Sequence, residues 1–232
     1  MRRIIGALAT AALTACAPPA PEPAEQPAAP AAAEPAPPTA SDASDERRTV
    51  LFVGTSLTAG YGVGDDVAFP AVIQELIDSA GLPFRVVNAG ISGETSAGGL
   101  RRIDWSLQEP VDVLVLELGA NDGLRGLDPT AMRAKLDAII RRTRDRYPDV
   151  AVVLVGMEAP PNLGDDYTTR FRAVFTDLAG QYDAALVPFL LDGVAGDRAL
   201  NIDDGIHPNE DGHRIAAATV WRVLEPVLSA RD

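Results

Sequence analysis

Residues 111–118 read VDVLVLEL, and Pro110 and Gly119 close this stretch at its two ends. Apart from Asp112 and Glu117, every residue in it is Val or Leu. A short apolar run of this kind, bounded by residues that break regular structure, predicts a buried β-strand. The run scarcely alternates with polar residues, which is typical of a sheet that is covered on both faces.

Shorter strand-like segments and helix-like segments alternate on both sides of this stretch. Four more strands are predicted at residues 49–53, 85–87, 150–155 and 185–187. Helices are predicted around residues 72–77, 96–108, 132–143, 165–182 and 220–224, and Pro226 is expected to end or kink the last of them. Alternating strands and helices imply parallel pairing, so the expected fold class is α/β, as a three-layer α/β/α sandwich. Trp105 and Trp221 are expected to pack in its core.

The first 46 residues are set apart from this fold. A basic start and a short apolar run lead to Leu13-Thr14-Ala15-Cys16. Residues 1–15 therefore read as a secretory signal. The segment also resembles the bacterial lipoprotein signal, which implies that Cys16, the only cysteine, is lipidated. The alternative is ordinary signal cleavage with an incidental Cys16.

A spacer is predicted to follow at residues 16–46. Residues 17–40 contain nine Pro and ten Ala, a composition that cannot bury enough apolar surface to fold. The folded domain is then residues 47–232. Together with Ala17 after the cysteine, this organisation predicts an exported protein, lipid-anchored to the bacterial envelope at the outer membrane and facing the periplasm.

The composition excludes several classes of protein. The chain carries 20 basic and 33 acidic side chains, a formal charge of -13, which argues against a nucleic-acid partner. One cysteine excludes an intrachain disulfide framework and a multi-cysteine zinc site. A Gly-x4-Gly-Lys motif is absent from the sequence, so a nucleotide site is not indicated. No metal or cofactor is expected.

Polar residues follow the predicted strands at the points where they end. Ser56 follows the first strand, Gly93 the second and Asn121 the third, while Asp204 and His207 lie in the long loop after the fifth. The carboxyl ends of parallel strands share one edge of a sheet, where ligands bind. We therefore expect these five residues to lie close together.

These residues suggest acyl transfer. A serine hydroxyl needs a base, and only two histidines are available. His213 is expected on the surface, whereas Pro208 keeps His207 out of a helix, where Asp204 could orient its imidazole. The alternative for His207 is a surface histidine beside a helix start.

Gly93 and Asn121 are the candidates for stabilising the tetrahedral intermediate. Its oxyanion needs preorganised donors, such as a backbone N–H at a glycine and a side-chain amide. The alternative for both positions is a tight turn.

Four short motifs, in this order, carry a resemblance to a known family: residues 54–57 (GTSL), 88–93 (NAGISG), 119–122 (GAND) and 204–207 (DGIH). Together they resemble the SGNH (GDSL-type) hydrolases, and most of all the bacterial arylesterase and multifunctional thioesterase/lysophospholipase group. The resemblance covers residues 49–228.

The resemblance implies a flavodoxin-like five-stranded parallel sheet. It implies Ser56 as nucleophile, His207 as base and Asp204 as its partner. It also implies Ser56 N–H, Gly93 N–H and the Asn121 amide as oxyanion donors, with residues 121–126 as a loop over the substrate. The family usually has Asp before the serine, where this chain has Thr55.

The sequence thus predicts a serine esterase that hydrolyses carboxylic esters or thioesters (aryl esters, acyl thioesters or lysophospholipids). An apolar acyl pocket is expected to be lined by Met157, Ala159, Pro160 and Leu163. The expected partners are a small acyl-ester substrate and, through the anchor, a membrane. The alternative is a non-catalytic surface lipoprotein that uses the same fold as a binding module.

Overall fold

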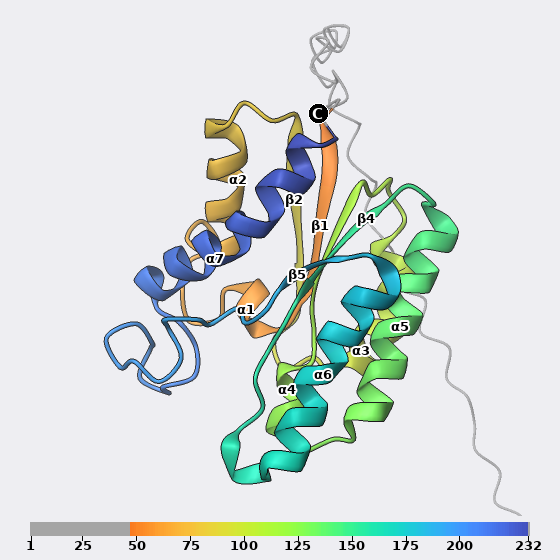
Figure 1. Cartoon of the computed structure of the whole chain (residues 1–232). Helices are drawn as coiled ribbons and strands as arrows, with labels where there is room; N and C mark the ends of the chain where they lie inside the picture. Colours follow the sequence, from red (N-terminus) through yellow and green to blue (C-terminus); the bar gives the residue numbers. More distant parts are fainter. Residues whose placement is uncertain (1–46, 232) are drawn as a thin grey trace, which may run out of the picture. The chain divides into compact units, whose positions relative to one another are not determined.

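A computed structural model describes residues 47–231 (Figure 1). The predicted signal peptide, the lipidation of Cys16 and the spacer lie outside the described residues. In chain order the elements are β1 (Arg48–Gly54), α1 (Ser56–Ala59), α2 (Phe69–Ser79), β2 (Phe84–Gly90), α3 (Ser96–Ser106), β3 (Val113–Glu117), α4 (Ala120–Leu124), α5 (Pro129–Arg146), β4 (Ala151–Val155), the 3-10 turn η1 (Pro161–Leu163), α6 (Asp165–Tyr182), β5 (Ala185–Val187) and α7 (Glu210–Ser229).

The strands form one five-stranded sheet in the order β2-β1-β3-β4-β5, and every neighbouring pair is parallel. Gly54, the last residue of β1, is in register with Gly90 on β2 and with Glu117 on β3. The carboxyl ends of the three strands are therefore level. The chain moves from β1 to β2 on one side and then to β3 on the other, which makes the β1/β3 boundary the switch point of the sheet.

Helices cover both faces of the sheet, as Figure 1 shows. Helices α2 and α7 pack together on one face, and α3, α5 and α6 lie on the other. All five residues of β3 are buried, because this strand lies at the centre of the sheet. The expected three-layer α/β/α fold is confirmed. None of the helices in the described part is both long and apolar enough to cross a membrane.

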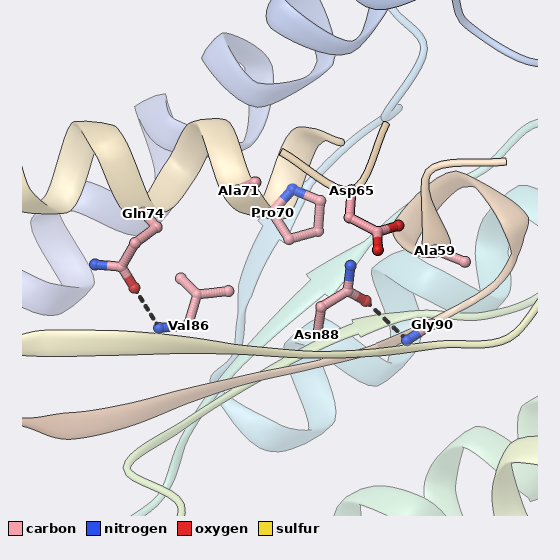
Figure 2. Close-up of a pocket in the computed structure, with 8 residues that line it drawn as sticks. All are labelled: Ala59, Asp65, Pro70, Ala71, Gln74, Val86, Asn88 and Gly90. Carbon is pink, nitrogen blue, oxygen red and sulfur yellow. Dashed lines mark hydrogen bonds between the residues drawn. The ribbon is translucent and has the colours of Figure 1, made fainter. Parts of the chain in front are cut away.

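The edge strand β2 is partly closed by a side chain from α2. Gln74 accepts a hydrogen bond from the Val86 N–H (2.6 Å) and donates to the Phe84 carbonyl (3.3 Å). Figure 2 shows Gln74 reaching from the helix to the strand across a groove of about 490 Å³. Pairing the outer groups of an edge strand removes a template for unwanted strand pairing.

Two positions differ from the sequence-based expectation. Trp105 is 69% exposed, because it lies two residues beyond the buried Ile103 and so points away from the core. His213 is buried rather than on the surface, because it extends the apolar stripe of α7 that packs on α2. Of the two outcomes expected at Pro226, the end of the helix is not observed: α7 continues to Ser229, since a proline there removes only one hydrogen bond near the end of the helix.

Candidate active site

The polar residues that follow the strands meet at the switch point of the sheet. Ser56 is the first residue of α1, directly after β1, and Asn121 lies in α4, directly after β3. Gly93 lies in the loop after β2, and the loop between β5 and α7 brings His207 to the same place. All four line one cavity of about 520 Å³.

Ser56, His207 and Asp204 form a hydrogen-bonded row. His207 Nε2 lies 2.8 Å from Ser56 Oγ, and His207 Nδ1 lies 2.6 Å from Asp204 Oδ2. Because a carboxylate only accepts, Nδ1 carries the proton and Nε2 is free to accept the serine hydroxyl. This arrangement is suited to removing a proton from Ser56.

The Asp204 carboxylate is held by the backbone of its own loop. Its Oδ1 accepts from the N–H groups of Ile206 and His207, both at 3.0 Å. Partial burial acts to raise the pKa of Asp204, but these bonds and the His207 imidazole outweigh it and lower the pKa below its ordinary value. Asp204 therefore remains ionised, as a partner of an imidazolium must be.

Tyr61 packs against the imidazole. The ring centroids of Tyr61 and His207 are 4.7 Å apart, with the planes tilted by 47°. The Tyr61 N–H also donates to the Ser56 carbonyl at 3.0 Å. Tyr61 thus contacts both ends of the Ser56–His207 pair and limits the positions that the imidazole can take.

The loops that carry Gly93 and Asn121 are tied to each other. Asn121 Nδ2 donates to the Glu94 carbonyl (3.0 Å), and an Arg125 guanidinium nitrogen donates to the Gly93 carbonyl (3.0 Å). Gly93 has φ +78°, a conformation that favours glycine. The Asn121 amide keeps a second hydrogen, which is free to bond an oxyanion in the cavity.

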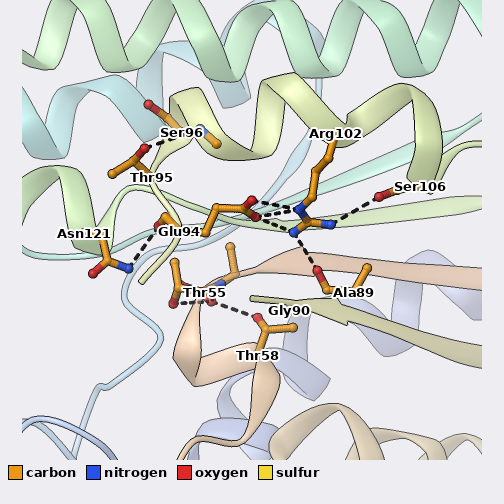
Figure 3. Close-up of polar contacts among 12 residues, drawn as sticks. Thr55, Thr58, Ala89, Gly90, Glu94, Thr95, Ser96, Arg102, Ser106 and Asn121 are labelled. Atoms are coloured by element: carbon orange, nitrogen blue, oxygen red, sulfur yellow. Dashed lines mark hydrogen bonds and ion pairs between the residues drawn. The ribbon is translucent and has the colours of Figure 1, made fainter. Parts of the chain in front are cut away.

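A partly buried ion pair fixes the loop from behind, as Figure 3 shows. The Arg102 Nε donates to both Glu94 carboxylate oxygens (2.8 and 2.9 Å), and an Nη nitrogen also contacts Glu94. The same guanidinium donates to the Ala89 carbonyl (2.7 Å) and to Ser106 Oγ (3.2 Å). Because Glu94 directly follows Gly93, this ion pair holds the glycine relative to β2 and α3.

The lining of the cavity is largely apolar beyond Ser56. Met157, Ala159 and Pro160 line it, as expected for an acyl pocket. Leu163 does not line it: it lies in η1 and packs on the hydrophobic core instead. Leu124 belongs to the predicted substrate loop at residues 121–126; it lines the cavity, although residues 120–124 form helix α4 rather than a loop. The sequence did not identify Ile206, which also lines the cavity, and more than half of each of these two residues is exposed. An isolated apolar residue in a loop carries no periodic signal that would reveal such a role.

Two polar contributors also went unrecognised in the sequence, Tyr61 and Glu117, and Arg125 was predicted only as part of the loop at residues 121–126. Glu117 is the most informative, since an acidic residue within an otherwise apolar strand is itself a signal. It is fully buried at the end of β3 and accepts hydrogen bonds from Thr55 and Thr58, on either side of Ser56. Within residues 47–231, no group of three or more His, Cys, Asp or Glu side chains is arranged to hold a metal ion.

Sequence and structure comparisons relate this chain to known proteins. Residues 52–215 match the model of the GDSL-like Lipase/Acylhydrolase family. The chain is 40% identical to Esterase TesA of Pseudomonas aeruginosa over 182 residues, 78% of this chain and 90% of the relative. It is 36% identical to Thioesterase 1/protease 1/lysophospholipase L1 of Escherichia coli strain K12, over 78% of this chain and 85% of the relative.

A solved structure is similar as well. The fold matches the psychrotrophic esterase EstA from Pseudoalteromonas sp., in a structure inhibited by monoethylphosphonate, with a TM-score of 0.73 and 32% identity. The match covers 78% of this chain and 99% of EstA.

Proposed function

This chain belongs to the GDSL-like lipase/acylhydrolase family and is a serine ester hydrolase, and we propose that Ser56, His207 and Asp204 carry out its reaction. The observation that carries the assignment is the 2.8 Å contact between Ser56 Oγ and His207 Nε2. The alternative of a non-catalytic binding module has no support, since the named relatives are esterases and thioesterases.

The reaction proceeds through an acyl-enzyme. His207 Nε2 takes the Ser56 proton as Oγ attacks the carbonyl carbon of the substrate, and Asp204 stabilises the imidazolium that forms. The tetrahedral intermediate collapses when the bond to the leaving group breaks, and His207 returns the proton to that group. A water molecule, deprotonated by His207, then attacks the acyl-enzyme, which releases the carboxylic acid and restores Ser56.

The oxyanion of the intermediate needs donors that are already in place. The Ser56 N–H, the Gly93 N–H and the free Asn121 amide hydrogen are the candidates. Arg125 and the Glu94–Arg102 ion pair support the last two by fixing the loop that runs from Gly93 to Glu94. Donors held by such bonds need little reorganisation during the reaction.

The substrate class follows from the shape and lining of the cavity. A volume of about 520 Å³ with Met157, Ala159 and Pro160 on its wall suits a medium or long acyl chain. We propose acyl esters, acyl thioesters and lysophospholipids as substrates. The similarity to Esterase TesA and to Thioesterase 1/protease 1/lysophospholipase L1 supports this range.

The proposal is tested with a series of p-nitrophenyl esters and the matching acyl thioesters, from two to sixteen carbons. We expect kcat/KM to rise with chain length until the apolar cavity is filled. Ser56→Ala should fold normally and lose turnover on every member, and it should not react with a fluorophosphonate probe. Retained turnover or labelling in this variant would refute Ser56 as the nucleophile.

We also propose that the chain is exported and lipid-anchored through Cys16 to the outer membrane, facing the periplasm. The support is the sequence alone: the basic start, the apolar run and Leu13-Thr14-Ala15 before the only cysteine. Metabolic labelling with an alkyne fatty acid, followed by membrane fractionation, tests this. The full chain should be labelled in the outer membrane, and Cys16→Ala should be unlabelled. Labelling of Cys16→Ala would contradict the assignment.

A further inference from the structure

Glu117 is a buried acid beneath the proposed nucleophile. It is the last residue of β3 and is 0% exposed, while the other four residues of that strand are Val or Leu. An ionised carboxylate in such surroundings is costly unless donors surround it. The hydrogen-bond donors around Glu117 therefore indicate which segment its carboxylate stabilises.

The partners come from the N-cap residue of α1, Thr55, and from the first turn of this helix, Thr58. Glu117 Oε2 accepts from the Thr55 N–H (2.8 Å), the Thr55 hydroxyl (2.9 Å) and the Thr58 hydroxyl (2.8 Å). Figure 3 shows Thr55 and Thr58 on this turn, within the same region as the Glu94 loop. Burial raises the pKa of Glu117 to about 7, and the bonds from Thr55 and Thr58 oppose that rise.

Ser56 lies between the two threonines that Glu117 binds. The Thr55 hydroxyl also accepts from the Leu57 N–H at 3.4 Å, which caps the first turn of α1. The carboxylate is thus connected to the residue before Ser56 and to the residue two places after it. A shift of Glu117 would move both the Ser56 hydroxyl and the Ser56 N–H.

Gly54 makes this close approach possible. A Cβ at position 54 would lie 2.0 Å from Thr58 Oγ1 and 2.6 Å from Glu117 Oε2. Neither neighbour could move away without breaking its bond to the other. Gly54 is therefore needed for space, in the strand residue that precedes the turn.

Thr55 also acquires a role in this arrangement. Members of the family usually have Asp at this position. An Asp here would place a second carboxyl group against Glu117, and two such groups tend to share a proton. Thr55 instead donates its hydroxyl to Glu117. The departure from the family motif is thus compatible with a buried carboxylate that holds the turn.

We propose that Glu117 is a positioning residue of the active site: together with Thr55 and Thr58 it fixes the turn that presents the Ser56 hydroxyl and N–H. This inference rests on the proposed role of Ser56 as nucleophile. Glu117 does not touch the substrate and acts only through the turn.

The test compares Glu117→Leu with Glu117→Gln on a p-nitrophenyl acyl ester. Leucine keeps the volume but removes both acceptors, whereas the Gln amide oxygen still accepts at the Oε2 position. We expect kcat of Glu117→Leu to fall roughly 10- to 100-fold with little change in KM, because a small misplacement of a reacting group costs up to about 100-fold. Glu117→Gln should restore most of kcat. Each rate is divided by the concentration of active sites. That concentration is measured by letting the reaction with the fluorophosphonate probe go to completion.

Thr143→Val is the matched control. Thr143 is also fully buried, and its hydroxyl donates to the Ile139 carbonyl within α5 (2.9 Å), away from the site. It should lower the melting temperature and leave kcat per active site unchanged. If Glu117→Leu does not fold, Thr58→Val replaces it, with a smaller but measurable fall in kcat expected.

A kcat per active site equal to that of the wild type in folded Glu117→Leu, or in Thr58→Val where the leucine variant is not folded, would overturn the inference. So would an effect confined to KM. The proposed function is tested separately. Activity in Ser56→Ala would refute Ser56 as the nucleophile. An inactive Ser56→Ala together with a fully active Glu117→Leu would refute only the positioning role of Glu117.

Discussion

His207 Nε2 lies 2.8 Å from Ser56 Oγ although 151 residues separate the two along the chain. The contact depends on two separate supports. Glu117 holds the turn that carries Ser56 by accepting hydrogen bonds from Thr55 and Thr58. Asp204 holds the imidazole of His207 at Nδ1, the ring nitrogen that faces away from Ser56.

Replacing Asp204 by Asn should lower kcat by between about 10² and 10⁴, because the imidazole loses the partner that fixes its tautomer and stabilises its charge. KM should change little, since Asp204 lies behind the imidazole. Steady-state kinetics on a p-nitrophenyl ester measures both constants. An unchanged kcat would show that the 2.6 Å contact between Asp204 and His207 is dispensable.

Removing the Asn121 amide should lower kcat by roughly 10²- to 10³-fold, the usual cost of losing one oxyanion donor. Asn121→Ala also removes the bond to the Glu94 carbonyl, so thermal unfolding should be measured alongside the kinetics. A variant that keeps its kcat would exclude Asn121 as an oxyanion donor, whatever its stability.

An acidic side chain at the mouth of the cavity should weaken the binding of long acyl chains. Leu124 lines the cavity and is 54% exposed. We expect Leu124→Asp to lower kcat/KM for a long-chain ester about tenfold, as the loss of partly buried apolar surface predicts, and to spare a two-carbon ester. Leu127→Asp is the control, because Leu127 is exposed to a similar degree and does not line the cavity. Equal effects of the two variants would argue against an acyl site at Leu124.

Glu117 should make the protein less stable as the pH rises. Its pKa is raised by burial from 4.5 to about 7, so the folded state keeps a proton that the unfolded chain releases. The stability that this group contributes is fully present below pH 4.5 and is lost as the pH rises through 7. The loss in the free energy of unfolding is on the order of 3 kcal/mol. The free energy of unfolding of Glu117→Gln, from urea titrations at pH 4.5, 6 and 8, should therefore exceed that of the wild type increasingly as the pH rises. Parallel curves would show that Glu117 does not titrate on folding.

His213 should act in the opposite direction. Burial, helped by the nearby charge of His207, lowers its pKa from 6.5 to about 4. The Phe69 N–H donates to its Nδ1, so the folded state holds a neutral ring. Stability from this group is present above pH 6.5 and is lost as the pH falls toward 4.

His213→Gln keeps an acceptor for the Phe69 N–H and does not titrate. Its free energy of unfolding should therefore rise relative to that of the wild type as the pH falls from 6.5 to 4 in the same urea titrations. Because Glu117 and His213 oppose each other over most of this range, the wild type should be flatter there than either variant. A steeper acid loss in His213→Gln would contradict the direction of the pKa shift.

The sequence was most informative where its signals are local. The run at residues 111–118 has the length and composition of a strand buried on both faces, and β3 is entirely buried. The alternation of strands and helices then leads to a parallel sheet, and that topology alone brings Ser56, Asn121 and His207 to one edge. These inferences need only periodicity and chain order.

The errors occurred where burial is decided by distant segments. Trp105 and Leu163 are large and apolar, yet one is exposed and the other packs outside the cavity. His213 is polar in type and buried in fact, because helix α2 covers it. Residue type gives a preference for burial, whereas the neighbouring element determines the outcome.

By itself, the sequence determined the layered α/β fold, the shared edge of the sheet and the residues capable of acyl transfer, because periodicity and strand order follow from the order of the residues. Only the tertiary structure decided that Glu117 lies under Ser56, that Tyr61 packs on His207, and that Arg125 bonds the Gly93 carbonyl. Such contacts join segments that no local pattern relates, since each depends on distances that exist only after the sheet and its two helical layers have packed.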